Sequence, residues 1–188
     1  MGKSTIAKSL GQHYGLAWMR TDTIRDFMRT LVPKESHAKL FNSDGYTAEQ
    51  FLNKFSVEEI AQMELDQADD VRSGVKFFIN ARSDWPEGFV CEGVNIVPSW
   101  VAQDFASSTE VQTIFISNRD EQRIRNVVYN RGLFAPAKTY SDDVKEKEVE
   151  WVLRFDDLLR KEIQKYNLPL IELTYTDHDI DNILKFLL

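Results

Sequence analysis

The sequence is poor in cysteine and carries fewer basic than acidic residues. A single cysteine, Cys91, excludes an internal disulfide framework, and its place in an apolar run predicts a buried, inert thiol. Lys and Arg number 23 against 30 Asp and Glu, which gives a net charge of −7. This balance excludes a broadly basic surface for nucleic acid or anionic membranes. We expect neither partner, so any anionic ligand must be held by local cations.

Long apolar runs and signal-peptide patterns are also absent, which predicts a cytoplasmic protein without membrane spans. His13, His37 and His178 are scattered without metal-ligand spacing, which argues against a metal site built from them. The 188 residues are 43% hydrophobic and 28% charged, as in ordinary globular proteins. We therefore expect one domain over residues 1–188.

The first residues match part of a phosphate-binding motif. Gly2-Lys3-Ser4-Thr5 fits the second half of G-x-x-x-x-G-K-[ST], whose backbone N–H groups at a helix N-terminus cradle phosphates. In that motif Lys reaches the terminal phosphates and the Ser or Thr hydroxyl binds Mg²⁺. Apolar residues at helical spacing follow, and Gly15 is expected to end the helix. The first loop glycine and its strand would lie before Met1, which would hold the last variable loop position.

A strand and a helix follow. Residues 16–20 form a short apolar run, so Asp22 stands at the end of a strand and the start of a helix, where open α/β sheets place their ligands. Capping of that helix by Thr21 or Asp22 is an equally good interpretation. Arg25 and Arg29 share one face of the helix and either bind an anionic group or are solvated charges.

The next segment is predicted to be mainly helical. After a loop over 33–47 and a short helix over 48–55, the capping box that begins at Ser56 starts a long helix that ends near residue 84. We expect its acidic face to be solvated, a face that includes Glu64, Asp66, Asp69 and Asp70.

A second strand over 89–93 ends in Glu92. In phosphate-loop enzymes an apolar strand that ends in Asp or Glu aims its carboxylate at Mg²⁺ or its water shell. The alternative is a plain strand-end carboxylate in the turn at Gly93. Another strand is expected within 109–117.

The densest arginine segment follows, in a chain that is acidic overall. It contains Arg119, Arg123, Arg125 and Arg131. We predict a helical lid over about 118–140 that brings Arg123 and Arg131 to a phosphoryl-transfer site. The alternative is a surface helix whose own acids pair with these arginines.

Strands and helices alternate to the end of the chain, with a helix over 142–166, a strand over 168–173 and a helix over 177–188. The pattern predicts an α/β protein of three α/β/α layers around a mostly parallel sheet. Its first, central strand is missing from the sequence.

Three stretches look like those of phosphate-loop small-molecule kinases, and within that group the chain resembles the 2-phosphoglycerate kinase family. They are Gly2-Lys3-Ser4-Thr5, Thr21-Asp22-Thr23-Ile24-Arg25 with Arg29, and Cys91-Glu92-Gly93-Val94-Asn95-Ile96-Val97-Pro98. The third resembles the family's Glu-Gly-Val-His-x-x-Pro pattern. Asn95 stands where that pattern has His, so the identity of the acceptor stays open.

The resemblance implies a P-loop NTPase fold, ATP and Mg²⁺ as cofactors, and transfer of the γ-phosphoryl group to a small anionic acceptor such as 2-phosphoglycerate or a related sugar acid. It implies ATP binding by Gly2, Lys3, Ser4 and Thr5, and Mg²⁺ at Ser4 and Glu92. Asp22 would orient or deprotonate the acceptor hydroxyl. Further acceptor contacts would come from Arg25, Arg29, Glu92, Gly93 and Asn95. Arg123 and Arg131 would act from the lid.

Two other functions stay open from the residues alone. One is a nucleoside or nucleotide kinase, which differs in its acceptor. The other is a nucleotide-binding domain that transfers nothing, because half of the phosphate loop is absent.

Overall fold

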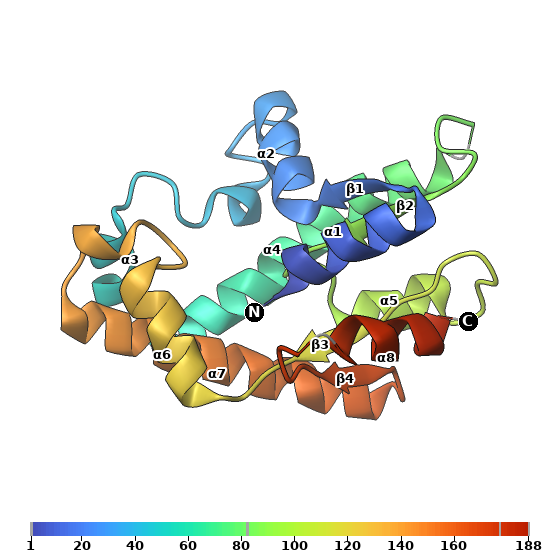
Figure 1. Cartoon of the computed structure of the whole chain (residues 1–188). Coiled ribbons are helices and arrows are strands. Elements are labelled where there is room, and N and C mark those ends of the chain that lie inside the picture. The colour runs from blue at the N-terminus through green and yellow to red at the C-terminus, as the bar shows by residue number, and fades with distance from the viewer. Residues whose placement is uncertain (1, 82, 177, 188) are drawn as a thin grey trace.

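The computed structural model describes residues 2–81, 83–176 and 178–187 and shows an α/β protein (Figure 1). Its strands are β1 (Ala17–Arg20), β2 (Phe89–Glu92), β3 (Phe115–Ser117) and β4 (Leu170–Glu172). Its α-helices are α1 (Lys3–Tyr14), α2 (Thr21–Leu31), α3 (Ala48–Lys54), α4 (Val57–Asn80), α5 (Pro98–Phe105), α6 (Glu121–Asn130), α7 (Asp142–Lys165) and α8 (His178–Leu187). Two short 3-10 helices are η1 (Ala38–Phe41) and η2 (Ala137–Thr139). No described helix is long and apolar enough to cross a membrane.

The start of α4 confirms the predicted capping box. The Ser56 hydroxyl accepts a hydrogen bond from the Glu59 backbone N–H at 3.2 Å, and the Glu59 carboxylate accepts one from the Ser56 backbone N–H at 2.7 Å. This reciprocal pair satisfies two N–H groups that the helix cannot. The helix ends at Asn80, a few residues before the predicted end.

The strands form two parallel pairs instead of one continuous sheet. β1 pairs with β2, with Arg20 opposite Glu92, and β3 pairs with β4, with Phe115 opposite Leu170. The third strand occupies only the end of the range 109–117 within which it was expected, because only Phe115–Ser117 pair with β4. No strand of the described residues pairs with both β2 and β3.

The two strand pairs β1–β2 and β3–β4, which we call the half-sheets, nevertheless lie between the same two layers of helices. Alternate side chains of a strand point to opposite faces. One set packs against α1 and α8 and includes Val90, Ile116 and Ile171. The other set packs against α2, α4, α5 and α7 and includes Met19, Cys91, Phe115 and Leu170. Helices therefore cover both faces of the two parallel strand pairs.

A large cavity is lined by residues of both half-sheets, of the α1 N-terminus and of α4. Its volume is about 1930 Å³, above the roughly 300–1,000 Å³ of an ordinary small-molecule pocket. It therefore has room for more than one small ligand.

The segment predicted as a lid is attached to α7. Ile124 and Val128 of α6 pack on Val149. The buried carboxylate of Glu148 accepts hydrogen bonds from two backbone N–H groups, of residues 133 and 134, and from the Tyr140 hydroxyl at 2.6 Å. Closure of this segment over a ligand remains a prediction.

Candidate functional site

The site begins at the N-terminus of α1. Gly2 caps the helix with φ of +92°, a left-handed conformation that favours glycine. A Cβ there would also meet Leu173 at 3.0 Å and Tyr175 at 3.1 Å. Lys3, Ser4 and Thr5 form the first turn and line the cavity. The first N–H groups of a helix have no partner within it, so this turn suits an anion.

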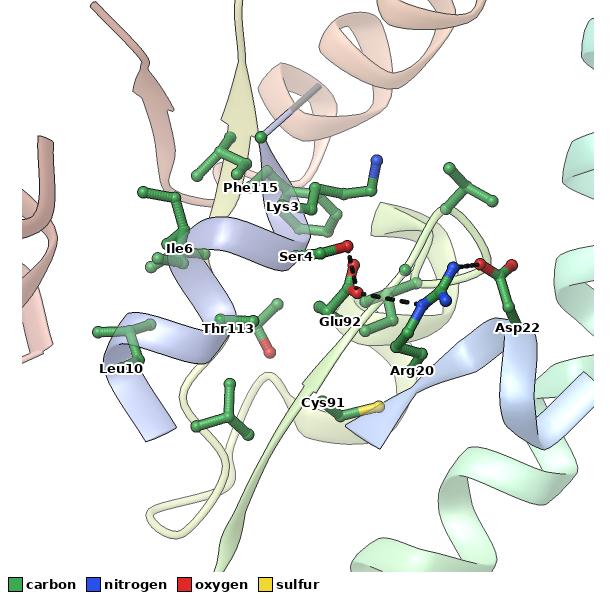
Figure 2. A pocket seen from close by; sticks show the side chains of 18 of the residues that line it. Lys3, Ser4, Ile6, Leu10, Arg20, Asp22, Cys91, Glu92, Thr113 and Phe115 are labelled. Carbon is green, nitrogen blue, oxygen red and sulfur yellow. Dashed lines mark hydrogen bonds and ion pairs between the residues drawn. The ribbon is translucent and has the colours of Figure 1, made fainter. Parts of the chain in front are cut away.

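Ser4 and Glu92 meet at the end of β2. The Ser4 hydroxyl donates a hydrogen bond to Glu92 Oε1 at 2.8 Å, and Arg20 Nε lies 3.7 Å from the same oxygen (Figure 2). Glu92 is buried. Because β1 and β2 are parallel and in register at Arg20 and Glu92, their carboxyl ends bring a cation and an acid to one edge.

Asp22 lies beside this pair in the first turn of α2. Its carboxylate forms ion pairs with Arg20 Nη2 at 2.6 Å and with Arg25 Nη1 at 3.4 Å. The N-cap position of α2 is held by Arg20 and not by Thr21 or Asp22. The structure therefore favours a position in a charged network over the capping interpretation.

Lys3 lies next to Ser4 at the start of α1 and lines the cavity (Figure 2). Burial lowers the pKa of Lys3, and the carboxylates of Glu92, Asp22 and Glu64 oppose this shift, whereas Arg131 adds to it. The site thus holds three acids, and its four cations are Lys3, Arg20, Arg25 and Arg131.

The residues expected to bind the acceptor separate into two groups. Arg25 lines the cavity and donates from Nη1 to Gln67 Oε1 at 3.3 Å. Arg29 does not line it, because its Nε donates to the Leu40 carbonyl at 2.5 Å. Asn95 is fully buried behind the cavity wall, and its amide donates to Gln67 at 3.4 Å.

Gly93 is required by close packing at the end of β2. A Cβ at this position would lie 1.7 Å from Thr21 Oγ1. Gly93 lines the cavity, so the β1 and β2 ends approach each other through a backbone without a side chain.

The arginines of the 118–140 segment also fall into two groups, those that line the cavity and those that form ion pairs elsewhere. Arg123 and Arg131 are exposed and line the cavity, and the guanidinium carbon of Arg123 lies 3.4 Å from the Tyr175 ring centroid. Arg119 instead pairs with Asp157 at 2.8 Å, and Arg125 pairs with Glu121 and Glu146. The structure brings to the cavity the two arginines that the sequence favours.

Sequence reasoning missed Glu64, Tyr175 and Arg20. Glu64 was expected on a solvated face, but it is half-buried and lines the cavity. The spacing of Ile60, Glu64 and Ala68 carries the missed signal, because residues four apart share a helix face and the outer two are buried. Tyr175 follows β4 in a left-handed conformation, with φ of +58°, which no sequence pattern indicated.

The oxygens of Ser4 and Glu92 suit Mg²⁺. This ion is usually held by one or two carboxylates, substrate phosphates and several waters. The described residues contain no group of three His, Cys, Asp or Glu that could hold a metal by themselves. A hydroxyl and a carboxylate oxygen 2.8 Å apart, beside a helix N-terminus, are a donor set that fits Mg²⁺ bound together with phosphate.

Comparison with known proteins finds similarity to enzymes of one kind, and each of these relatives is named a kinase. The chain is 28% identical over 196 residues to a 2-phosphoglycerate kinase of Methanothermobacter thermautotrophicus, covering 100% of this chain and 62% of that protein. It is 23% identical over 186 residues to a 2-phosphoglycerate kinase of Pyrococcus horikoshii, covering 98% of this chain and 60% of that protein.

A 2-phosphoglycerate kinase of Methanocaldococcus jannaschii is 22% identical over 190 residues, covering 100% of this chain and 60% of the relative. These similarities confirm the resemblance to the 2-phosphoglycerate kinase family over the whole chain. The chain spans about 60% of the length of these curated relatives. No family model matches the chain, and no solved structure matches it.

Proposed function

We propose that this protein is an ATP-dependent kinase that transfers the γ-phosphoryl group to a small anionic acceptor, with 2-phosphoglycerate or a related sugar acid as the first candidates. The observation that carries the proposal is the meeting of Lys3, Ser4 and Glu92 at the N-terminus of α1. The names of the relatives support the same reaction and acceptor.

In this proposal the ATP phosphates bind at the first turn of α1. The backbone of Gly2 and Thr5 and the ammonium of Lys3 hold the phosphates, because unpaired helix N–H groups and a cation both attract anions. Ser4 and Glu92 hold Mg²⁺, which when bound neutralises charge on the phosphates.

The acceptor lies beside Asp22 and Arg25. Arg25 supplies positive charge from the cavity wall, Asp22 fixes that guanidinium, and the Gly93 backbone allows close approach. Arg29 and Asn95 support the wall from behind through Leu40 and Gln67. Arg123 and Arg131 balance phosphate charge from the opposite segment. Phosphoryl transfer depends mainly on such positioning and charge neutralisation.

We also propose that a further β-strand lies between β2 and β3 in the working enzyme. The two half-sheets share their helix layers, each of their strands pairs with only one other strand among the described residues, and the cavity that both line is larger than a small ligand needs. Unpaired strand edges recruit another strand. Such a strand would lead its carboxyl end toward Gly2 and complete the phosphate loop.

The reading frame ahead of Met1 tests the strand. If about ten codons there encode an apolar run followed by Gly-x-x-x, a chain extended by that run should melt higher and bind Mg-ATP more tightly than the 188-residue chain. Equal melting temperatures and equal affinities would contradict the proposed strand.

The kinase proposal is tested with Mg-ATP and a panel of acceptors. We expect turnover with an anionic three-carbon acid, and we expect Lys3→Ala to lower kcat at least about 100-fold, because the cation that neutralises the transferred group is lost. Lys8→Ala is the matched control, since Lys8 lies on the same helix but is exposed over Trp18.

The alternatives have their own outcomes. Turnover of nucleosides or nucleotides instead of sugar acids would identify the second kind of kinase. Calorimetric binding of Mg-ATP without turnover of any acceptor would identify a nucleotide-binding domain. Lys3→Ala turnover within a few-fold of the unmodified protein would contradict the role of Lys3.

A further inference from the structure

Glu64 is a carboxylate on the buried side of α4 and lines the same cavity as Lys3 and Asp22. It follows the buried Ile60 by one turn and precedes the buried Ala68 by one turn. Its neighbour on that face, Gln67, accepts a hydrogen bond from Arg25. The middle of α4 therefore presents polar groups to the cavity at the point where the proposed acceptor lies.

Asp22 is poorly suited to accept a proton in this site. Its two carboxylate oxygens pair with different guanidinium groups, Oδ2 with Arg20 at 2.6 Å and Oδ1 with Arg25 at 3.4 Å. Asp22 instead fixes the two arginines at the edge of the β1–β2 pair.

The carboxylate of Glu64 differs from that of Asp22 in its partners. Of the residues that the structure describes, none forms a hydrogen bond or ion pair with its carboxylate. The charged groups that face it are Lys3 from α1 and Asp22, Arg25 and Arg29 from α2. Burial raises the pKa of Glu64, with Asp22 adding to the shift and the three cations opposing it. A carboxylate with a raised pKa is a stronger base than an ordinary one.

We infer that Glu64 is the catalytic base that takes the proton from the acceptor hydroxyl, while Asp22 is a positioning residue. The inference rests on the proposed kinase function. The acceptor oxygen forms a bond to the γ-phosphorus of ATP, and its proton passes to a Glu64 carboxylate oxygen. The bond between the γ-phosphorus and the bridging oxygen breaks, and its electron pair leaves with ADP.

The test compares Glu64→Gln, Asp22→Asn and the control Asp66→Asn in the 188-residue chain. Asp66 lies two residues along α4, accepts a hydrogen bond from Gln62 at 2.8 Å and does not line the cavity. Both α4 variants exchange an acid for its amide and remove one negative charge. Thermal unfolding and calorimetric Mg-ATP binding, expected to be near the unmodified values, show that each variant is folded.

We expect Glu64→Gln to lower kcat by about 100-fold or more, the usual contribution of a general base, with the acceptor KM within a few-fold. It should also lose the acidic limb of the kcat/KM profile, along which activity rises with pH as the Glu64 carboxyl ionises. Asp22→Asn should raise the acceptor KM more than it lowers kcat, and it should keep that limb. Asp66→Asn should change neither parameter.

Two results would overturn the role of Glu64 alone: near-normal kcat in Glu64→Gln, or loss of the acidic limb in Asp22→Asn but not in Glu64→Gln. If neither the 188-residue chain nor the chain extended by the proposed strand phosphorylates any acceptor, the kinase proposal fails and the role of Glu64 fails with it. Activity of the unmodified chain therefore separates the two failures.

Discussion

Replacing Gly93 with alanine should open the contact between the ends of β1 and β2. The added Cβ would lie 1.7 Å from Thr21 Oγ1, 2.7 Å from its Cβ and 2.9 Å from its Cγ2. Rotation of the Thr21 side chain cannot relieve the contact, because Thr21 Cβ is itself too close. Thr21 is fully buried and begins α2, so a strand and a helix must move apart.

We expect Gly93→Ala to lower the free energy of unfolding by about 3 kcal/mol, the upper end of the usual cost of overpacking. Thr21→Ala removes two of the three crowded atoms. In the double variant the cost of Gly93→Ala should fall to about 1 kcal/mol, a coupling within the range for residues in contact. The Thr21 hydroxyl has no hydrogen-bond partner among the described residues, so its loss is inexpensive.

Urea unfolding followed by circular dichroism measures all four proteins. Gly88→Ala is the control, because Gly88 has φ of +88° but open space around its Cβ position. That variant isolates the conformational cost of a left-handed residue, about 1–2 kcal/mol. Strictly additive effects of Gly93→Ala and Thr21→Ala would refute the close contact and, with it, the described approach of the strand ends.

Three further predictions concern groups around the site. Glu148→Gln should lower the free energy of unfolding by about 2 kcal/mol, because it weakens charge-assisted hydrogen bonds from the Tyr140 hydroxyl and two backbone N–H groups; a change below about 0.5 kcal/mol in urea unfolding would contradict this. Burial raises the pKa of the Cys91 thiol to about 12, so a disulfide reagent at pH 8 should label native protein far more slowly than urea-unfolded protein, and equal rates would contradict the burial. Burial raises the pKa of Asp179, but hydrogen bonds from Thr174 and two further backbone N–H groups lower it below the ordinary 3.8. The ionised carboxylate therefore stabilises the fold above pH 3.8, and the difference in unfolding free energy between the unmodified protein and Asp179→Asn should close as the pH falls below that value. A difference that is constant with pH would contradict the shift.

Sequence periodicity predicted the helices well because their caps and spacing are local. The helix expected over 142–166 is Asp142–Lys165, and the capping box at Ser56 forms as expected. The third strand lies within the predicted range, but its bounds could not be predicted, because the length of a strand depends on its partner. Nothing within 109–117 indicates that β4 offers only Leu170–Glu172.

The site residues that stand at the end of a strand or at the start of a helix could be predicted from the sequence. Ser4, Asp22 and Glu92 all stand where a strand ends or a helix begins, and the structure brings them together. Side-chain partners could not be predicted in this way. Arg29 lies on the same helical face as Arg25, but it donates a hydrogen bond to the Leu40 carbonyl in η1 and does not line the cavity.

Glu64 shows a different limit. A carboxylate on a long helix is more often solvated than buried, and the prediction for Glu64 followed this general tendency. Glu64 lies one helical turn from both Ile60 and Ala68, which are buried, and α2 packs against α4. Only these two facts together show that Glu64 faces the cavity.

The most direct test is transfer of labelled phosphate from [γ-³²P]ATP to 2-phosphoglycerate, with Mg²⁺, by the 188-residue chain and its Lys3→Ala variant. The phosphate-binding turn of α1 predicts a labelled acid that carries a second phosphoryl group, formed by the unmodified chain and nearly absent with the variant. No labelled product with any sugar acid, from this chain or from the chain extended by the proposed strand, or equal labelling by the unmodified chain and the variant, would contradict a kinase site at Lys3, Ser4 and Glu92.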